Sequence, residues 1–348
     1  MAVGYVYDAL YLEHATSGHP ESPQRLRAIV SNLKESGMLA QLEAIAPRDA
    51  GEEDLTLVHN AEHVARVRAS CSEAGLGCHW FDADTYAVPA SYAAALRAAG
   101  GVLAAVDAVL DGEVSSAFCL VRPPGHHATP TRAMGFCLFN NVAVAAAHAL
   151  ARRGLERVAI VDFDVHHGNG TQEAFYADPR VLYFSTHQYP HYPGSGHWSE
   201  VGEGSGRGAT VNVPLPRGCG DAEYLRAYEE VCQPLVRRFE PGLILVSAGF
   251  DAHFADPLAG MLVSCRGYYQ IAALLRRLAD EMCGGRIVYA LEGGYDLTAL
   301  AWSVRACIAT LLGNGFAADP LGLGPQVRGP EIETVLGAVK RVHALTPA

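Results

Sequence analysis

The sequence predicts an α/β fold with a central, mostly parallel sheet covered by helices on both faces. Apolar, β-branched runs alternate with Ala-, Leu- and Arg-rich stretches of helical length, a pattern typical of parallel sheets. The 348 residues are 50% hydrophobic, which is sufficient for a large core. No internal repeat and no Ser/Gly linker divides the chain. We therefore expect one domain over residues 1–348, with a motif-bearing core over about 1–313 and a C-terminal segment, 314–348, packed on it.

The elements follow in chain order from the hydrophobic pattern. Short apolar runs rich in Val and Ile predict strands at 2–7, 117–121, 158–163, 181–185, 210–213, 243–247 and 287–291. Longer amphipathic or Ala-rich stretches predict helices at 23–36, 61–74, 90–110, 141–153, 222–239, 266–283, 297–312 and near 332–343. Two Gly-, Pro- and His-rich stretches, 122–135 and 187–208, fit neither pattern and directly follow predicted strands. Long irregular segments at such places are typical of functional loops.

Composition excludes several classes of protein. A formal net charge of −11, with scattered Arg and only two lysines, argues against a nucleic-acid partner. Nine cysteines without a Cys-x-x-Cys pair fit reduced thiols better than a disulfide framework. The first residues lack a basic leader, and the longest apolar stretch, 142–150, is too short to cross a bilayer. We expect a cytoplasmic protein without a membrane partner; the loop 187–208 fits either a pocket rim or a homo-oligomer contact.

Three of the predicted strands stop on polar clusters, in the segments 158–167, 243–251 and 287–295. The carboxyl ends of parallel strands meet at one edge of a sheet, where sites form. Because side chains alternate along a strand, Asp162, Asp164 and His166 point the same way if the first strand persists to its end. Asp251 then arrives from a neighbouring strand. Two carboxylates and one imidazole are typical of a catalytic metal site with an open position.

We expect one metal ion, zinc, at this site. A second divalent ion would need a further carboxylate, for example two residues after Asp251. That position holds His253, and the residues after His166 are His-Gly-Asn. The sequence therefore favours a single-metal site over the two-metal sites of ureohydrolases, which are built on a related sheet.

A His pair and a Tyr supply candidate acid, base and oxyanion groups. His126 and His127 follow a Pro-Pro-Gly turn that fixes the backbone. Asp162 is the expected partner of one ring and Asn169 of the other, and the ring paired with an anion should be the more basic. Tyr295 follows Glu-Gly-Gly, where paired glycines permit a sharp turn that aims the phenol inward. A phenol opposite a metal donates to a developing oxyanion.

With these residues in view, the chain resembles the zinc-dependent histone deacetylase superfamily, and within it the class II-like bacterial amidohydrolases. Acetylpolyamine amidohydrolases and acetoin-utilisation proteins belong to the same superfamily. The matching motifs lie at 19–26, 122–127, 135–137, 162–172, 247–251, 256–258 and 292–295. The resemblance implies an arginase-like three-layer α/β fold and hydrolysis of an N-acyl amide. It covers residues 1–313.

The resemblance also implies residue roles. The zinc ligands would be Asp164, His166 and Asp251; the catalytic group would be His126, His127, Tyr295, Asp162 and Asn169, the last agreeing with class II enzymes. The substrate-binding positions would be Gly135, Phe136, Tyr192, Leu258 and Asp84. Potassium would be a structural cofactor at two sites, one matching Asp162, Asp164, His166, Ser185 and Thr186 and the other Phe175, Asp178 and Val181.

The substrate expected from these roles is an acylated lysine or a small acyl-amine. In the implied mechanism, zinc and Tyr295 polarise the amide carbonyl while His127, assisted by His126, takes a proton from water. Acetylpolyamine hydrolysis is the alternative, but it usually requires an acid at the pocket mouth, where this chain has Leu258. A non-catalytic acyl-lysine binding module is a third reading; it would need neither the His pair nor Tyr295.

Overall fold

The centre of the molecule is one eight-stranded sheet. The computed structural model describes residues 2–75, 77–325 and 329–345. The strand order is β2-β1-β5-β10-β9-β6-β7-β8, and every neighbouring pair is parallel. The strands are β1 (Val3–Val6), β2 (Glu43–Ile45), β5 (Ser116–Cys119), β6 (Val158–Asp162), β7 (Val181–Gln188), β8 (Thr210–Leu215), β9 (Leu243–Ala248) and β10 (Ile287–Leu291). A separate antiparallel pair is formed by β3 (His79–Trp80) and β4 (Tyr86–Ala87).

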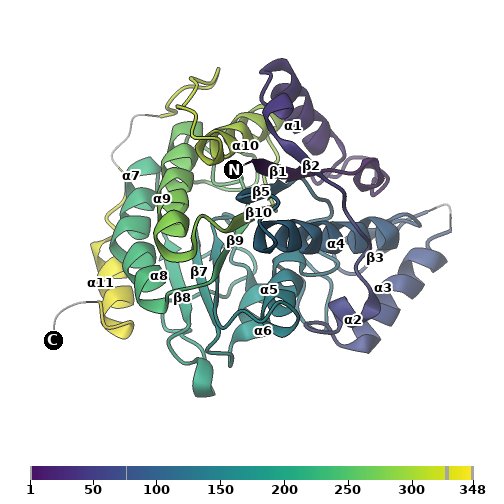
Figure 1. The fold of residues 1–348 in the computed structure, drawn as a ribbon, viewed down its shortest axis with the longest axis horizontal. Helices are drawn as coiled ribbons and strands as arrows, with labels where there is room; N and C mark the ends of the chain where they lie inside the picture. Colours follow the sequence, from purple (N-terminus) through teal and green to yellow (C-terminus); the bar gives the residue numbers. More distant parts are fainter. Residues whose placement is uncertain (1, 76, 326–328, 346–348) are drawn as a thin grey trace.

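Helices cover both faces of the sheet, as the alternating pattern predicts (Figure 1). The helices are α1 (Gln24–Glu35), α2 (Glu52–Leu55), α3 (Ala61–Glu73), α4 (Ser91–Leu110), α5 (Asn141–Ala151), α6 (Asn169–Phe175), α7 (Asp221–Ala227), α8 (Gln233–Phe239), α9 (Cys265–Cys283), α10 (Leu297–Leu311) and α11 (Glu333–Val342). One layer contains α1, α10 and α9, and the other contains α4 and α5. The central strands β6, β9 and β10 are buried along their whole length because both faces are covered.

The helix expected at 222–239 is interrupted. It consists of α7, a π-helical turn (Tyr228–Cys232) and α8. Pro234 lies in the first turn of α8, where its missing N–H leaves no intrahelical bond broken. The π-helical turn separates α7 from α8, so the segment is not one regular α-helix.

Short elements were missed by the sequence pattern. The strand β2 and the helices α2 and α6 span only three, four and seven residues. A single turn of helix or three residues of strand cannot establish a hydrophobic period. The sequence pattern therefore predicts no element at these places, and α6 matters most because it begins at Asn169.

By length and composition alone, the helix α4 is long and apolar enough to cross a membrane. However, 67% of its apolar 18-residue stretch is buried inside the fold. It packs against α5, β5 and β10. At Gly100 an added Cβ would lie 2.1 Å from the carbonyl oxygen of Arg48, so neighbouring backbone lies directly against this helix. Its apolar composition is that of a core helix, and it gives only weak evidence of a span.

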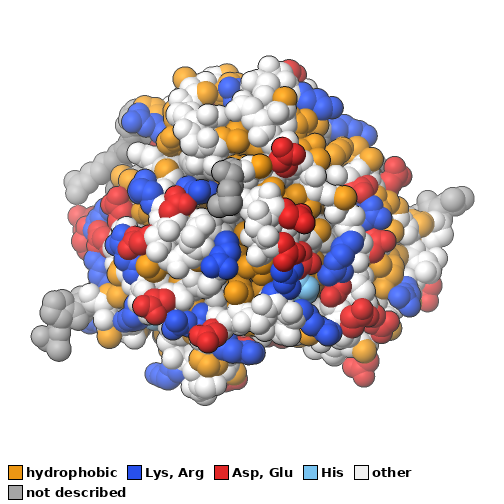
Figure 2. Space-filling model, in the orientation of Figure 1, with side chains coloured by type: hydrophobic (Ala, Val, Ile, Leu, Met, Phe, Trp, Pro, Cys, Tyr) orange, Lys and Arg blue, Asp and Glu red, His pale blue; other side chains and the backbone are white. Residues whose placement is uncertain are grey.

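On the face in Figure 2, acidic and basic side chains are interspersed.

The described part of the C-terminal segment contains α11, which packs on β8. Residues 326–328 and 346–348 of the predicted segment lie outside the described residues. The assignment of 1–348 to one domain stays a prediction.

The three strands that end in polar clusters are adjacent in the sheet, in the order β10-β9-β6. Asp162 of β6 pairs with Ser247 of β9, and Ser247 pairs with Ala290 of β10. The three strands therefore end at the same level, and the residues that follow them meet at one edge of the sheet. This edge carries the candidate site.

Candidate active site

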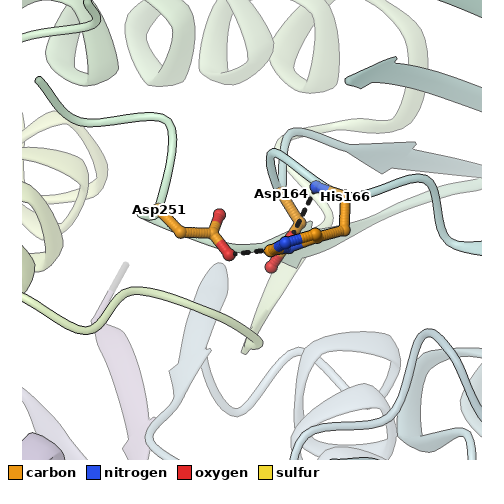
Figure 3. A group of neighbouring side chains, drawn as sticks. All are labelled: Asp164, His166 and Asp251. Carbon is orange, nitrogen blue, oxygen red and sulfur yellow. Dashed lines mark hydrogen bonds and ion pairs between the residues drawn. The ribbon is translucent and has the colours of Figure 1, made fainter. Parts of the chain in front are cut away.

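Asp164, His166 and Asp251 form a compact group at the ends of β6 and β9 (Figure 3). Their candidate ligand atoms all lie within 4.8 Å of one another. Nδ1 of His166 is 3.0 Å from Oδ1 of Asp164 and 3.1 Å from Oδ2 of Asp251. Both carboxylates are buried. Within the described ranges this is the one such group of three side chains able to hold a metal ion.

The electrostatics of this group fit a cation. Burial and the neighbouring Asp164 charge both raise the pKa of Asp251. Burial alone would lower the pKa of His166, but its hydrogen bonds to Asp164 and Asp251 raise it to about 10. A proton on Nδ1 of His166 thus lies between the buried carboxylates of Asp164 and Asp251, which would otherwise repel each other. One nitrogen and two oxygens are donors that a divalent metal ion accepts.

Strand alternation does not position these ligands, contrary to the sequence-based expectation. The strand β6 ends at Asp162, so Asp164 and His166 lie in the turn after it. Oδ1 of Asp162 accepts the N–H of Asp164 at 3.1 Å, and Oδ1 of Asp164 accepts the N–H of His166 at 2.9 Å. These successive Asx-type turns bring the side chains together.

The His pair lies beside this group, and each ring has a different partner. Nδ1 of His126 is 3.0 Å from Oδ2 of Asp162, and Nδ1 of His127 is 2.8 Å from Oδ1 of Asn169. The ring centroids of the two histidines are 4.0 Å apart. In both cases Nδ1 is the donor that suits the partner oxygen, and Nε2 is left for chemistry.

The pKa values of the two rings diverge in the direction expected from their partners. Burial lowers the pKa of His126, but the charges of Asp162 and Asp164 raise it to about 10. A cation bound at Asp164 would reduce the effect of Asp164 on the pKa of His126 and leave the effect of Asp162. Burial and the nearby positive charges of His126 and His166 hold the pKa of His127 well below its ordinary value. These opposite directions favour a neutral His127 and a protonated His126, which suits a base and an acid.

Glu292 holds the loop that carries the His pair. Its Oε2 accepts the N–H groups of Gly125 and His126 at 2.6 and 3.2 Å, and its Oε1 accepts the hydroxyl of Ser247 at 3.1 Å. Burial raises the pKa of Glu292 to about 7. The sequence analysis treated Glu292 only as a neighbour of Tyr295. A buried acid at the end of β10 was the signal that could have identified its role.

Tyr295 is fixed by residues from two other segments. Asp256 accepts the N–H of Tyr295 at 2.6 Å, and Arg25 donates to the carbonyl oxygen of Gly294 at 2.7 Å. The guanidinium of Arg25 lies 5.1 Å from the centroid of the Tyr295 ring. Arg25 is fully buried and forms an ion pair with Glu21 at 3.1 Å. Neither Asp256 nor Arg25 was assigned a role from the sequence, although both lie in the quoted motifs.

A pocket of about 420 Å³ leads to these groups. It is lined by the predicted residues His126, His127, His166, Gly135, Phe136, Tyr192, Leu258, Asp84 and Tyr295, and also by His19, Pro20, Trp80, Ala83, Pro124, His191 and Gly293. All five predicted substrate positions therefore lie on its wall. His19, Trp80 and His191 were not predicted as site residues, although His19 lies in the motif 19–26 and His191 in the predicted functional loop 187–208.

The pocket wall is close-packed against the His pair. Gly135 has φ of +56°, and an added Cβ would lie 2.4 Å from Cδ2 of His127. The Tyr192 ring is 5.1 Å from that of His127, and the Phe136 ring is 5.8 Å from that of Tyr295. Only glycine fits at position 135, because both the backbone conformation and the space exclude a side chain.

Comparison with known proteins decides the family. Residues 19–311 match the family model of the histone deacetylase domain. The chain belongs to the histone deacetylase family. It is 41% identical to histone deacetylase 14, chloroplastic, of Arabidopsis thaliana over 96% of this chain and 82% of that protein. It is 44% identical to the histone deacetylase-like amidohydrolase of Pseudomonas aeruginosa over 88% of this chain and 80% of that protein.

A solved structure shows the same architecture. The crystal structure of the HDA15 HD domain matches with a TM-score of 0.88 and 38% identity, over 98% of this chain and 94% of that chain. The fold is the arginase/deacetylase-like α/β fold, and the predicted fold class is confirmed. This histone deacetylase family member is an amidohydrolase that acts on linear amides.

The first predicted potassium site of this deacetylase lies where β6 and β7 pair. Asp162 is in register with Ser185, and Thr186 follows it. The hydroxyl of Ser185 is 2.9 Å from Nδ1 of His187. Asp164 and His166 belong to the turn after β6. These five residues therefore lie close together, and the potassium site stays a prediction.

The residues of the second predicted potassium site lie between α6 and β7. The N–H of Asp178 donates to the carbonyl oxygen of Phe175 at 3.0 Å, and the N–H of Val181 donates to that of Asp178 at 3.4 Å. The Asp178 carboxylate binds Arg180 at 2.7 Å, so this side chain has a partner within the protein. A cation here would depend on the backbone carbonyls, and this site also stays a prediction.

Proposed function

We propose that this protein is a zinc-dependent deacetylase that hydrolyses N-acetyl- or N-acyl-lysine-type amides to a free amine and a carboxylate. The proposal rests on one observation above all. Two adjacent imidazoles, one paired with a carboxylate and one with a neutral amide, lie beside the group of two carboxylates and a third imidazole. A pure binding module would have no use for an acid and a base together.

In this proposal, Asp164, His166 and Asp251 would hold the metal ion that polarises the acyl carbonyl group. A zinc ion held by Asp164, His166 and Asp251 would act as a Lewis acid toward the acyl carbonyl and activate water. His127, neutral and aimed by Asn169, takes the proton from the attacking water at its Nε2. His126, protonated and held by Asp162, gives a proton to the departing amine. The two proton transfers thus use two rings with separated pKa values.

Tyr295 donates its phenol proton in a hydrogen bond to the oxygen that becomes negative. Burial raises the pKa of Tyr295 well above its ordinary value, so the O–H persists at neutral pH. Asp256 and Arg25 keep the Tyr295 backbone and ring in place through the contacts described above. A donor that is already oriented costs no reorganisation when charge develops.

An acyl-lysine is the substrate class favoured by the pocket. Phe136 and Tyr192 give the pocket aromatic walls, and Leu258 adds an aliphatic side chain to its lining. The four-carbon stem of lysine suits such walls, while a distal ammonium near Leu258 would lose water without gaining a partner. An acetylpolyamine is the second candidate because Asp84 also lines the pocket and provides one acid.

A direct comparison of substrates tests the proposal. We expect kcat/KM for an acetyl-lysine peptide with amidated ends to exceed that for N-acetylputrescine, measured on the zinc-loaded enzyme in the same buffer. A clear preference for the acetylpolyamine would overturn the assignment of substrate class. Hydrolysis of neither substrate, with zinc bound, would overturn the proposed function itself.

Leu258→Glu should move the preference toward the polyamine. The new carboxylate would pair with the distal ammonium, and a partly exposed ion pair of about 1 kcal/mol corresponds to roughly a fivefold shift in the ratio of kcat/KM values. Leu258→Gln is the matched control, since it adds a polar group of similar size without charge. An equal shift in both variants would mean that polarity, and not charge, controls the rim.

A further inference from the structure

A second cavity opens beside the active-site pocket. It has a volume of about 750 Å³ and is lined in part by Gln188, Pro190, Arg217 and Pro257. His191 and Leu258 line both this cavity, which we call the groove, and the active-site pocket, so the two share a wall. Nε2 of His191 is 3.2 Å from the carbonyl oxygen of Leu258, which ties the shared wall together. The His191 ring stacks on the ring of His166 with centroids 5.1 Å apart.

Arg217 provides this groove with a cation. It is exposed and follows β8. It forms no ion pair with any carboxylate in the described ranges, whereas many other arginines of this acidic chain do. It lines the same cavity as His191 and Leu258, the two residues of the shared wall. An unpaired guanidinium beside a substrate pocket is suited to a carboxylate.

The Arg217 side chain lies against a fixed backbone. A Cβ added to Gly260 would lie 2.4 Å from Nε of Arg217 and 2.5 Å from its Cζ. The N–H of Gly260 donates to Oε1 of Gln188 at 2.9 Å, and its carbonyl oxygen accepts the N–H of Gly218 at 2.9 Å. The Arg217 guanidinium therefore lies against the backbone of Gly260, whose N–H and carbonyl oxygen both have hydrogen-bond partners. Gly260 has no positive φ, so an alanine there is permitted by the backbone.

The active-site mouth carries the opposite charge at another part of its rim. Asp84 lines the active-site pocket, and Asp82 is close enough to raise its pKa together with burial. Oδ1 of Asp82 accepts the N–H of Asp84 at 3.1 Å, so both acids belong to one turn. A part of the substrate that extends from the pocket toward the groove thus meets the cationic Arg217. A part that extends toward this turn meets the acidic Asp82 and Asp84.

We propose that Arg217 forms an anion subsite that binds a carboxylate carried by the acyl-lysine substrate beyond its aliphatic stem. This inference rests on the proposed function and adds a substrate preference to it. The carboxylate has two possible sources: the α-carboxylate of free Nε-acyl-lysine, or an acidic side chain next to an acyl-lysine in a peptide. The same groove disfavours a distal ammonium, in agreement with the low activity expected on acetylpolyamines.

The test uses two substrate pairs that differ only in charge. One pair is Nα-acetyl-Nε-acetyl-lysine as carboxylate and as carboxamide. The other is an end-blocked peptide with Asp or Asn after the acetyl-lysine. We expect the wild-type enzyme to prefer the anionic member of at least one pair by about fivefold in kcat/KM, mainly through KM, and 0.5 M salt to reduce that preference.

Three variants assign the preference to the groove. Arg217→Gln should abolish the preference while leaving kcat/KM for the neutral members unchanged, and Arg217→Lys should keep part of it. Gly260→Ala should reduce it without altering the charge, because the new methyl group displaces the guanidinium. Arg277→Gln is the matched control: Arg277 is exposed on α9 and lines neither cavity.

The outcomes separate the possibilities. A preference confined to the first pair identifies an α-carboxylate, and one confined to the second identifies a flanking acid. Equal rates within both pairs, or a preference that survives Arg217→Gln, would overturn the subsite. Loss of preference in Arg277→Gln to the same extent would overturn it too, by showing a net-charge effect. Failure to hydrolyse any of the four substrates would instead refute the proposed function.

Discussion

Asp251→Ala should abolish zinc binding and deacetylase activity together. The substitution removes one of three side chains from a group whose ligand atoms lie within 4.8 Å of one another. Loss of a direct ligand should exceed the ~10–100-fold effect on metal affinity of changing a residue that only supports one. The measurement is metal content per chain after dialysis against a zinc buffer, alongside kcat/KM on an acetyl-lysine peptide. We expect about one zinc per wild-type chain and almost none in the variant.

Two further variants separate ligand loss from structural damage. Oδ1 of Asp251 also accepts the N–H of Val165 at 2.9 Å, so alanine leaves a buried donor unpaired. Asp251→Asn retains an oxygen for that bond but removes the charge, and it should still lose most of the zinc. Asp221→Asn is a control at a half-buried acid that accepts the N–H of Ser264 at 2.7 Å, and this variant should keep its zinc. Two manganese ions per active wild-type chain would contradict the single-metal argument.

The sequence sufficed to predict the long elements and the edge of the sheet that carries the site. The runs that became β6, β9 and β10 are buried on both faces, so each is a continuous apolar run with a sharp polar end. Parallel connection then requires their carboxyl ends to meet. The structure places Asp164, His166 and Asp251 together for this reason.

The groups that hold the site in place could not be predicted in the same way. Glu292 and Asp256 act through backbone N–H groups of residues 167 and 39 positions away in the chain, Gly125 and Tyr295. Such contacts depend on loop conformation, which leaves no period in the sequence. The turn after Asp162 shows the same limit, because hydrogen bonds from backbone N–H groups to the carboxylates of Asp162 and Asp164 form a turn where alternation assumed a strand.

The pocket rim depends even more on tertiary structure. Trp80 comes from a two-residue strand, and His191 from the long irregular loop after β7. The composition of the loop 187–208 indicated a functional segment, but nothing in the sequence indicated that His191 or Trp80 itself faces the site. The resemblance to a family identified the pocket floor from its motifs, but the charge of Arg217 beside the rim emerged only from the arrangement in space.

Tyr295→Phe should lower kcat by roughly the 10²–10³-fold expected for loss of one oxyanion donor. The ring would remain under the guanidinium of Arg25, and the N–H of residue 295 would still donate to Asp256, so the pocket wall should be unchanged. Within the part of the chain that the structure describes, the Tyr295 hydroxyl forms no hydrogen bond with Asp164, His166 or Asp251, so zinc content and KM should stay close to the wild-type values. Tyr192→Phe is the matched control: it removes a phenol from the same pocket, 40% exposed, and should have little effect on kcat. Single-turnover rates measured with one acetyl-lysine peptide on all three proteins decide the matter, since full activity in Tyr295→Phe would assign oxyanion stabilisation to the metal alone.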